Sequence, residues 1–346
     1  MSKKVKIGNL YIGGGEIPAV QSMSTYKPSD LDNAISQALS VERLGCDIFR
    51  YSVLDEADAL SFAKIKEKVK MPLVADIHFD YKLALKSIDG GADKIRINPG
   101  NIGSENNVKE VAVALKRAEI PVRVGSNSGS IEKEFLDKYG RTEIALAESA
   151  LDKVYTLEKL GVDNIVISVK ASSVPLTIKA CEYIRSRCDY PIHVGVTEAG
   201  TEFSGIIKSA VGIGSLLSRG IGETIRVSLS ASPEREVEAG LKILSALELK
   251  NDRPNVVACP TCGRCEWDCM GFAKLTEDYV KDIKAPVKIA IMGCVVNGPG
   301  EAKDADIGVA GAKGGCVIFK KGEILKTVSE KELKEVFFAE IDKWRN

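Results

Sequence analysis

Eight short β-rich runs alternate with helical patterns over the first part of this chain, and this order constrains its fold more than any other feature. The runs begin near Pro18, Cys46, Pro72, Ala92, Pro121, Asn164, Pro191 and Thr224. Between them, segments such as Ser29–Leu44 and Asp55–Val69 carry apolar residues at helical spacing. Eight consecutive β–α units predict an α/β fold in which residues 1–250 form a (β/α)8 TIM barrel.

Permanent cations gather where the predicted strands end, which is where TIM-barrel enzymes place their active sites. The five cations are Arg50, Arg96, Arg123, Lys170 and Arg226. Placed around one mouth, they would repel each other by about 1–4 kcal/mol per close pair, and a bound polyanion would relieve that repulsion. Because a guanidinium matches phosphate oxygens well, the sequence predicts a small phosphate or diphosphate ester as the ligand. The alternative is that each cation pairs with a carboxylate on a neighbouring loop.

Polar residues share these strand ends. They are Gln21, Asp76, His78, Asn98, Asn127, His193, Glu198 and Ser228. An isolated histidine is more often structural than catalytic, but Asp76 lies two residues before His78, so both side chains should point to the same side of the barrel. Neither a G-x-G-x-x-G sequence after the first strand nor a Walker A sequence is present, which argues against a nicotinamide or nucleoside triphosphate site.

Charge and hydropathy exclude several classes of protein. The chain carries 48 basic and 48 acidic residues and no long basic tract, so we expect no nucleic-acid surface. Its most continuous apolar run, Ile289–Val296, is far shorter than the ~20 residues of a membrane span. Nine cysteines without a signal peptide indicate metal binding rather than disulfides. We therefore expect a cytoplasmic metalloprotein that binds no membrane.

A second, small α/β domain is predicted over residues 256–346, after a polar linker at 250–255. Four of its cysteines follow the C-x2-C-x2-C-x3-C spacing of bacterial ferredoxins: Cys259, Cys262, Cys265 and Cys269. Four thiolates could also hold zinc. Alternatively, Cys259 and Cys262 could join Cys294, which lies in a glycine-rich turn after an apolar strand. The spacing leaves these ligand sets open.

Five motifs carry a resemblance to a known family. They are KIRINPGNIG at 94–103, VTEAG at 196–200, ETIRVSLSASPEREV at 223–237, CPTCGR at 259–264 and MGCVVNGPGE at 292–301. With them, the chain from about Val5 to Lys320 resembles the bacterial (E)-4-hydroxy-3-methylbut-2-enyl diphosphate synthases of the non-mevalonate isoprenoid pathway. The resemblance implies a barrel that binds 2-C-methyl-D-erythritol 2,4-cyclodiphosphate and a C-terminal domain that holds one 4Fe-4S cluster per chain.

The resemblance also assigns residues. It implies four cluster ligands, Cys259, Cys262, Cys294 and Glu301, and leaves Cys265 and Cys269 as non-ligands. It implies that the substrate is bound by Arg50, His78, Arg96, Asn98, Arg123, Asn127, Lys170, Arg226 and Ser228. Glu236 and Asp76 are candidates to deliver a proton. Because a carboxylate is a harder and more exchangeable ligand than a thiolate, Glu301 is expected to leave the cluster when substrate binds.

The implied reaction is a two-electron reductive ring opening and dehydration of the cyclodiphosphate. The chain shows no flavin or nicotinamide site of its own, so reduced ferredoxin or flavodoxin should supply the electrons. Two other readings are a non-catalytic ferredoxin-type electron carrier on a scaffold barrel, and a barrel lyase or transferase with a structural zinc. The first leaves the five converging cations without a role.

Geometry predicts a dimer. The last barrel helix should run ~24 Å back toward the barrel bottom. The six-residue linker then reaches at most ~20 Å. A cluster in the second domain would therefore start far from the mouth of its own barrel, and a head-to-tail homodimer with shared active sites is expected, in agreement with the family.

Overall fold

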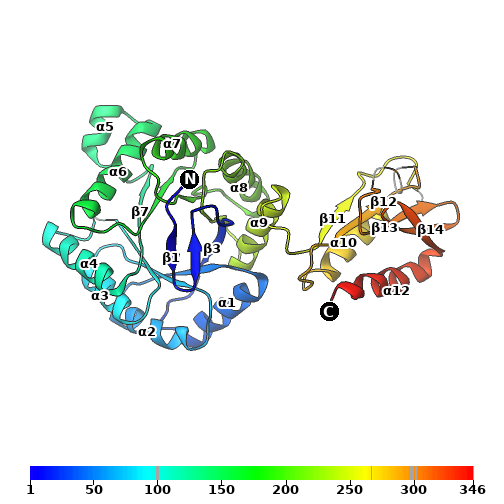
Figure 1. The fold of residues 1–346 in the computed structure, drawn as a ribbon, viewed down its shortest axis with the longest axis horizontal. Helices are drawn as coiled ribbons and strands as arrows, with labels where there is room; N and C mark the ends of the chain where they lie inside the picture. The colour runs from blue at the N-terminus through cyan, green and yellow to red at the C-terminus, as the bar shows by residue number, and fades with distance from the viewer. Residues whose placement is uncertain (99–100, 266, 297–299, 301, 346) are drawn as a thin grey trace. The chain divides into compact units, whose positions relative to one another are not determined.

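The computed structural model describes residues 1–98, 101–265, 267–296, 300 and 302–345. The chain divides into two compact units, Met1–Leu249 and Lys250–Asn346 (Figure 1). Glu301, one of the predicted cluster ligands, lies outside the described residues.

The first unit is built on eight parallel strands. They are β3 (Ala19–Met23), β4 (Ile48–Ser52), β5 (Leu73–Asp76), β6 (Lys94–Ile97), β7 (Val122–Asn127), β8 (Ile165–Lys170), β9 (His193–Val194) and β10 (Thr224–Ile225). Their order in the sheet is β8-β7-β6-β5-β4-β3-β10-β9, and a parallel bridge between Ile167 and Ile192 joins the two ends. The sheet thus closes on itself, which confirms the predicted TIM barrel.

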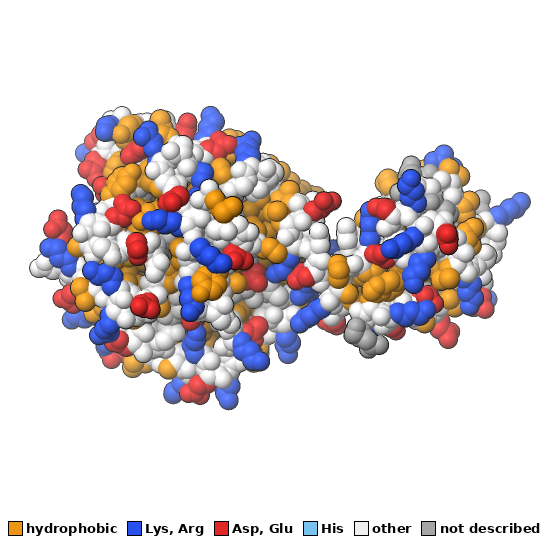
Figure 2. All heavy atoms as spheres, viewed as in Figure 1, with side chains coloured by type: hydrophobic (Ala, Val, Ile, Leu, Met, Phe, Trp, Pro, Cys, Tyr) orange, Lys and Arg blue, Asp and Glu red, His pale blue; other side chains and the backbone are white. Residues whose placement is uncertain are grey.

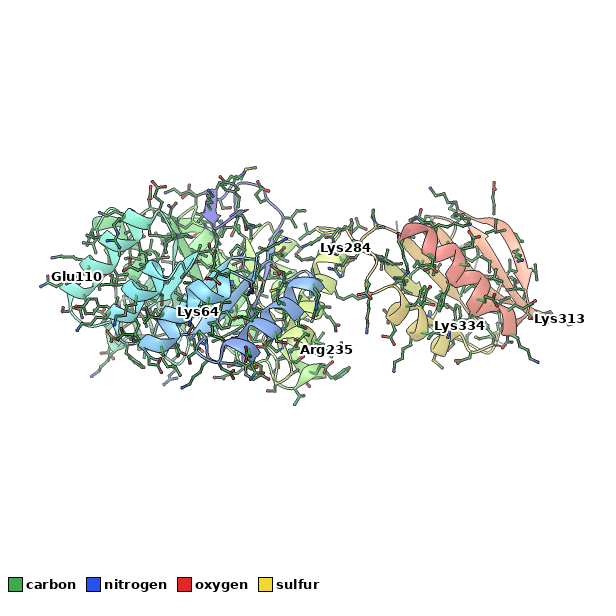
Figure 3. The ribbon with its side chains drawn as sticks, turned by 90° about the horizontal axis from the view of Figure 1, so that it is seen from below. Lys64, Glu110, Arg235, Lys284, Lys313 and Lys334 are labelled. Atoms are coloured by element: carbon green, nitrogen blue, oxygen red, sulfur yellow. The ribbon has the colours of Figure 1, made fainter. Side chains whose placement is uncertain are left out.

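Nine helices of the described chain surround this barrel (Figure 1). They are α1 (Leu31–Leu44), α2 (Glu56–Lys66), α3 (Tyr81–Asp89), α4 (Glu105–Ala118), α5 (Lys133–Tyr139), α6 (Glu143–Lys159), α7 (Val174–Arg187), α8 (Glu202–Leu217) and α9 (Pro233–Ala246). In α1 the buried residues Ala34, Ala38 and Val41 recur at helical spacing, and Gly45 ends the helix in the left-handed conformation with φ 96°. Outward side chains such as Lys64 and Glu110 are exposed (Figure 3).

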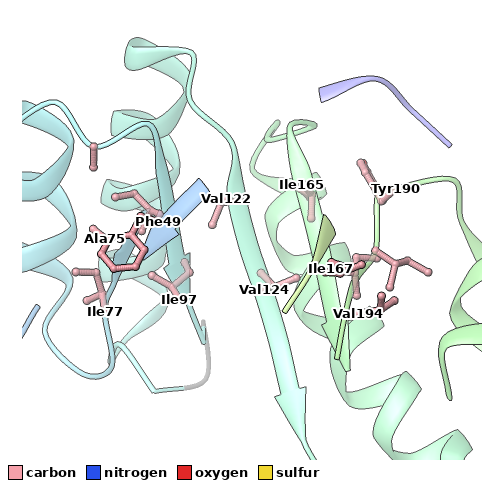
Figure 4. Packing of buried hydrophobic residues seen from close by; sticks show 14 of the residues in the cluster. Phe49, Ala75, Ile77, Ile97, Val122, Val124, Ile165, Ile167, Tyr190 and Val194 are labelled. Carbon is pink, nitrogen blue, oxygen red and sulfur yellow. The ribbon is translucent and has the colours of Figure 1, made fainter. Parts of the chain in front are cut away.

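Alternation along the strands separates an apolar outer layer from a polar interior. Val122 and Val124 belong to the apolar cluster between strands and helices (Figure 4), whereas Arg123 between them points the other way. By the same alternation, the side chains of Arg50, Asp76 and Arg96 point into the barrel. The interior can tolerate these charges only where they are paired or bind a ligand.

An N-terminal hairpin closes one end of the barrel. Its strands, β1 (Val5–Ile7) and β2 (Leu10–Ile12), pair antiparallel. The fully buried side chains of Ile7 and Ile12 pack against apolar residues at the N-terminal ends of the barrel strands, Ala19, Ile48, Val74 and Val166. The charged end of the barrel is therefore the opposite, C-terminal end.

A buried polar network anchors the segment that follows β7. The Nζ of Lys153 on α6 lies 2.5 Å from Glu132 Oε1 and donates hydrogen bonds to Ser126 Oγ at 3.0 Å and Ser149 Oγ at 2.9 Å. Lys153 is 4% exposed. Burial opposes ionisation of the Glu132 carboxyl, but hydrogen bonds from Lys153 and Ser149 outweigh it and lower its pKa below 4.5. The network holds this segment beside the end of β7, where Asn127 lies.

Replacing Lys153 with methionine should destabilise the barrel unit by about 2 kcal/mol, because it leaves the half-buried Glu132 carboxylate without its cation. We expect the thermal unfolding midpoint to fall by about 4–8 °C, measured by calorimetry on the full chain. The pKa of Glu132 is lower in the folded than in the unfolded chain, so the difference between variant and wild type should be full at neutral pH and shrink below about pH 4.5. Lys159→Met, an exposed change on the same helix, is the control, and an equal loss in it would contradict the assignment.

In its described residues, the second unit contains a five-stranded mixed sheet packed against helices. The strands are β11 (Asn255–Ala258), β12 (Lys288–Met292), β13 (Ile307–Ala312), β14 (Gly315–Lys320) and β15 (Glu323–Val328). The first three pair in parallel and the last two join antiparallel. Helices α10 (Cys269–Tyr279) and α12 (Glu330–Ile341) contribute Phe272, Phe337 and Phe338 to its core, and η1 (Asp342–Trp344) ends the chain.

Both signs of charge are interspersed over the visible surface of each unit (Figure 2). Within the described residues, the helices are all too short or too polar to cross a lipid bilayer.

Candidate functional site

Asp76, the last residue of β5, lies between two arginines at the C-terminal end of the barrel. Its Oδ1 accepts a hydrogen bond from Arg96 Nη1 at 3.0 Å, and its Oδ2 lies 3.6 Å from Arg50 Nε and 3.8 Å from His78 Nε2. Burial alone would raise the pKa of the Asp76 carboxyl, but Arg50, Arg96 and Arg123 outweigh it and lower that pKa. Asp76 is therefore an ionised anchor that fixes two guanidinium groups.

Glu236, in the first turn of α9, anchors a third guanidinium. Its Oε1 accepts hydrogen bonds from Arg226 Nη2 at 3.2 Å and from the backbone N–H of Leu229 at 3.0 Å. Its Oε2 accepts from Ser22 Oγ at 2.8 Å and from Arg226 Nε at 3.3 Å. Four donors thus hold a carboxylate that is 4% exposed.

Two further cations lack a carboxylate partner among the described residues. Arg123 is 3% exposed, and its Nε and Nη1 have no hydrogen-bond partner in that part of the chain. Burial, with Arg50 and Arg96 nearby, lowers the pKa of Arg123 well below its usual value. Burial, with Arg123 and Arg226 nearby, does the same to the pKa of Lys170. We call Arg50, Arg96, Arg123, Lys170 and Arg226 the cation ring.

The cation ring is held close together. The sulfur of Met23, a weak acceptor, lies 2.7 Å from Arg50 Nη2 and 3.6 Å from Arg226 Nη1. The sequence-based alternative of one carboxylate for each cation therefore holds only for part of the set: Asp76 serves Arg50 and Arg96, and Glu236 serves Arg226. The positive charge that remains fits a polyanionic ligand.

The remaining predicted substrate residues lie at or just beyond the same strand ends. Asn98, after β6, is buried, and Ser228, after β10, is half-buried. Asn127, the last residue of β7, and His78, after β5, are exposed. All four lie at the C-terminal ends of their strands, where the sequence predicts the substrate-binding residues.

Sequence analysis missed Lys94 and Ser22. Lys94 is fully buried, and its Nζ lies 3.4 Å from Gln21 Oε1. The alternation of side chains along the strand could have identified Lys94, because it lies two residues before Arg96 and therefore points to the same side. Ser22 binds Glu236 from the outward-facing side of β3, and nothing in the sequence indicates that contact.

Loops at the C-terminal ends of β11 and β12 bring the cysteines of the second unit together. Cys259 directly follows β11, and its backbone N–H binds Ile291 O of the neighbouring parallel strand at 2.9 Å. Cys294 follows β12 by two residues. A Cβ on Gly293 would lie 3.1 Å from Cys265 Sγ and 3.9 Å from Cys259 Sγ, so the missing side chain leaves room for these thiols.

The exposed Arg264 links the other two predicted cysteine ligands. Its pKa is raised by Cys262 and by a hydrogen bond with Cys294. In contrast, Cys269 is 1% exposed, and burial raises its thiol pKa to about 12. Burial likewise raises the thiol pKa values of Cys46 and Cys181 to about 12.

By chemistry, these thiols suit a soft metal cluster. Cys259 and Cys294 are partly exposed and Cys262 is exposed, on the loops that follow β11 and β12. In residues 1–98, 101–265, 267–296, 300 and 302–345, no three cysteine, histidine or carboxylate side chains already surround one point as metal ligands. Glu301 lies outside that set.

Comparison with solved structures shows the barrel fold. Dihydropteroate synthase of Xanthomonas albilineans, in complex with indole-2-carboxylic acid and 6-chloroguanine, superposes with a TM-score of 0.51 at 10% identity, over 72% of this chain and 98% of that chain. The 7,8-dihydropteroate synthase of Vibrio fischeri ES114 gives 0.51 at 12% identity, over 72% and 100%. At such low identity the likeness concerns the fold alone.

Comparison with curated proteins gives closer relatives. The chain is 54% identical over 344 residues to 4-hydroxy-3-methylbut-2-en-1-yl diphosphate synthase (flavodoxin) of Caldanaerobacter subterraneus subsp. tengcongensis, covering 99% of this chain and 97% of that protein. It is 52% identical to the protein of the same name in Caldicellulosiruptor saccharolyticus, covering 99% and 98%. Family models for the GcpE TIM-barrel domain and the GcpE protein C-terminal domain match residues 2–241 and 255–343. The chain therefore belongs to the GcpE family.

Proposed function

We propose that this chain is a 4-hydroxy-3-methylbut-2-en-1-yl diphosphate synthase, an oxidoreductase that opens 2-C-methyl-D-erythritol 2,4-cyclodiphosphate reductively. The observation that carries the proposal is 48–54% identity to the first eight curated relatives, all of that name, over 99% of this chain. Counted on the fully protonated acids, the substrate takes up two electrons and two protons and releases one water. The product is (E)-4-hydroxy-3-methylbut-2-enyl diphosphate.

In this proposal the cation ring binds the diphosphate. Arg50 and Arg96, held by Asp76, and Arg226, held by Glu236, present preorganised guanidinium groups to phosphate oxygens. Arg123 and Lys170 gain in the bound anion the negatively charged partner that no described carboxylate gives them. The exposed or half-buried His78, Asn127 and Ser228, together with Asn98, would bind the hydroxyl groups of the substrate.

The proton has two candidate sources, Glu236 and Asp76. The lowered pKa of Asp76 makes it a poor acid at neutral pH, and its two arginine contacts suit an orienting role. Glu236 is the other candidate, and hydrogen bonds from Ser22 and Leu229 would keep its carboxyl oriented if Arg226 turned to the substrate. Glu236→Gln would remove the acid, although its amide nitrogen cannot accept the hydrogen bonds that one of the two carboxylate oxygens accepts.

The second unit would hold one 4Fe-4S cluster through Cys259, Cys262, Cys294 and Glu301. When bound, such a cluster supplies electrons one at a time, which no side chain of this protein can do. Arg264 would place a positive charge beside the thiolates of Cys262 and Cys294. Reduced flavodoxin, the donor named for the relatives, is the proposed partner in the cytoplasm, with ferredoxin as the alternative.

The test is an anaerobic assay of the purified chain. Iron and acid-labile sulfide are counted first, and the cyclodiphosphate is then supplied with flavodoxin and its reductase, with the product followed by mass spectrometry. A brown protein that exchanges electrons with flavodoxin but leaves the cyclodiphosphate intact would favour the alternative in which the chain is a non-catalytic electron carrier. A colourless, sulfide-free protein after anaerobic purification would favour the zinc enzyme.

We further propose that the protein is a head-to-tail homodimer with shared active sites, and that α8 contributes to the contact between the two chains. Three apolar side chains recur at helical spacing on the outer side of this helix and are exposed: Phe203 by 78%, Ile207 by 49% and Val211 by 54%. Gly205, Ser209 and Gly212 are buried on its inner side. A continuous apolar stripe of this kind on a barrel helix is typical of a subunit interface.

Replacing Ile207 with glutamate should shift the protein to monomers, because it would bury a carboxylate in the centre of the apolar stripe. We expect a dimer for the wild type and at least a tenfold weaker association for the variant in sedimentation velocity at micromolar concentration. Lys208→Glu, at the neighbouring exposed position, also introduces a carboxylate and should have a smaller effect. A wild type that sediments as a monomer would refute the interface.

A further inference from the structure

A polar chain runs from the cation ring into the barrel across three neighbouring strands. The Nζ of Lys170, at the end of β8, lies 3.3 Å from Nε2 of His193 in β9. The Nδ1 of the same histidine lies 2.7 Å from Oγ1 of Thr224, its cross-strand neighbour in β10. His193 and Thr224 are both fully buried, and the function proposed above uses neither.

The donors and acceptors of this chain can be assigned from chemistry. When Lys170 carries its proton, its ammonium group can only donate, so Nε2 of His193 then accepts from it, and Nδ1 carries the ring proton and donates to Thr224. A protonated His193 would place a second cation against Lys170. Burial, with Lys170, Arg123, Lys94 and Arg50 nearby, lowers the pKa of His193 well below 6.5, so the ring stays neutral.

The backbone makes room for this contact. Gly195 follows β9, and a Cβ on it would lie 2.9 Å from Lys170 Nζ and 2.4 Å from Arg226 O. A side chain at this position would therefore push the lysine away from the histidine. The missing side chain lets the Lys170 amine lie over strand β9.

The Lys170 amine needs such a partner to keep its proton. Burial lowers its pKa, and Arg123 of β7, Arg226 after β10 and Arg50 of β4 lower it further, whereas Glu236 of α9 opposes them. A hydrogen bond from the charged form to a neutral acceptor favours the charged form without adding a competing charge.

We propose that His193, held in one tautomer by Thr224, is a positioning residue that keeps Lys170 charged and directed for binding the substrate diphosphate. The proposal rests on the proposed function for the identity of that substrate. The contact itself concerns only the affinity of the barrel for a diphosphate group.

The test uses the full-length holoenzyme and inorganic diphosphate, with binding measured by calorimetry between pH 6 and pH 9. His193→Leu should weaken binding about tenfold or more at pH 9 and less at pH 6, because Lys170 loses its proton at lower pH without the acceptor. His193→Gln, whose Oε1 can replace Nε2 as acceptor, should restore most of the affinity. Thr224→Val removes the hydroxyl that fixes the tautomer of His193 but leaves the imidazole in place, so it should reduce the affinity less than His193→Leu does. The inorganic diphosphate also changes its ionisation between pH 6 and pH 9, but this change is the same for every variant and does not affect the comparison with the wild type.

A double-mutant cycle decides how His193 acts. In the Lys170→Met background, His193→Leu should cause little further loss of affinity, because its effect passes through the lysine. An equal, pH-independent loss in both backgrounds, or no rescue by His193→Gln, would overturn the proposal. If this pattern appears but the wild type does not convert the cyclodiphosphate, the proposed function fails and the role of His193 stands.

Discussion

Replacing Arg123 with methionine should stabilise the ligand-free protein and at the same time reduce kcat/KM for the cyclodiphosphate about 100-fold or more. The side chains have similar lengths, but methionine carries no charge. Two guanidinium nitrogens of Arg123 lack partners among the described residues, and the side chain is 3% exposed. Removing a buried charge of this kind should raise stability by about 1 kcal/mol or more, and the thermal midpoint by about 2–4 °C.

The loss of activity arises in the substrate complex, whereas the gain in stability arises in the ligand-free protein. In the complex, Arg123 would neutralise a buried phosphate oxygen, and removing one partner of such a pair costs about 2–5 kcal/mol. Calorimetric unfolding without substrate and steady-state kinetics measure the two effects separately. Arg117→Met, which removes an exposed arginine paired with Asp89 at 2.8 Å, is the control and should change both quantities little. A variant that loses stability and activity together would mean that Arg123 is a structural residue.

The stability effect should depend on pH. Since the pKa of Arg123 is lower in the folded chain than in the unfolded chain, its charged form destabilises the fold at neutral pH. This penalty is full below the folded-state pKa, shrinks as the pH rises above it, and disappears only when the pH reaches the unfolded-state pKa. The advantage of Arg123→Met should therefore be full at neutral pH and shrink in alkaline solution.

Replacing Cys294 with serine should remove the iron, the acid-labile sulfide and all turnover. A serine hydroxyl is a poor ligand for a soft cluster, and the two remaining thiolates cannot hold it. Cys265→Ser should keep iron and sulfide close to wild-type content, because the proposed ligand set leaves Cys265 without a bond to iron. Cys188→Ser, a half-buried thiol of the barrel unit, controls for the loss of a thiol elsewhere.

The two variants separate the ligand sets that the sequence left open. A ferredoxin-type site would lose its cluster in Cys265→Ser and keep it in Cys294→Ser. A zinc site would contain no sulfide in any variant. A brown Cys294→Ser protein with full iron content would therefore contradict the ligand assignment.

The barrel and its cations were predictable because each depends on local order. Period-two alternation places Arg50, Asp76 and Arg96 on one side of their strands, and parallel strands end at one edge. The pairing of these residues was not predictable. Asp76 meets Arg96 because the register sets them opposite each other across β5 and β6, and register depends on the closed sheet as a whole.

Other features lay beyond sequence reasoning for physical reasons. The β1–β2 hairpin is too short to show a period, and it owes its stability to Ile48, Val74 and Val166 far along the chain. The partnership of His193 with Lys170 needs the gap left by Gly195, and a glycine in a sequence does not say which side chain fills its space. Cysteine spacing was ambiguous because loops bring Cys294 beside residues some thirty positions earlier.

The β1–β2 hairpin covers the N-terminal end of the barrel with apolar side chains. Ile7 and Ile12 are fully buried against the N-terminal ends of the strands, so the charged interior opens toward the C-terminal ends. Apolar packing alone then excludes water from that end, and the barrel needs no charged or moving element there to shield a bound substrate.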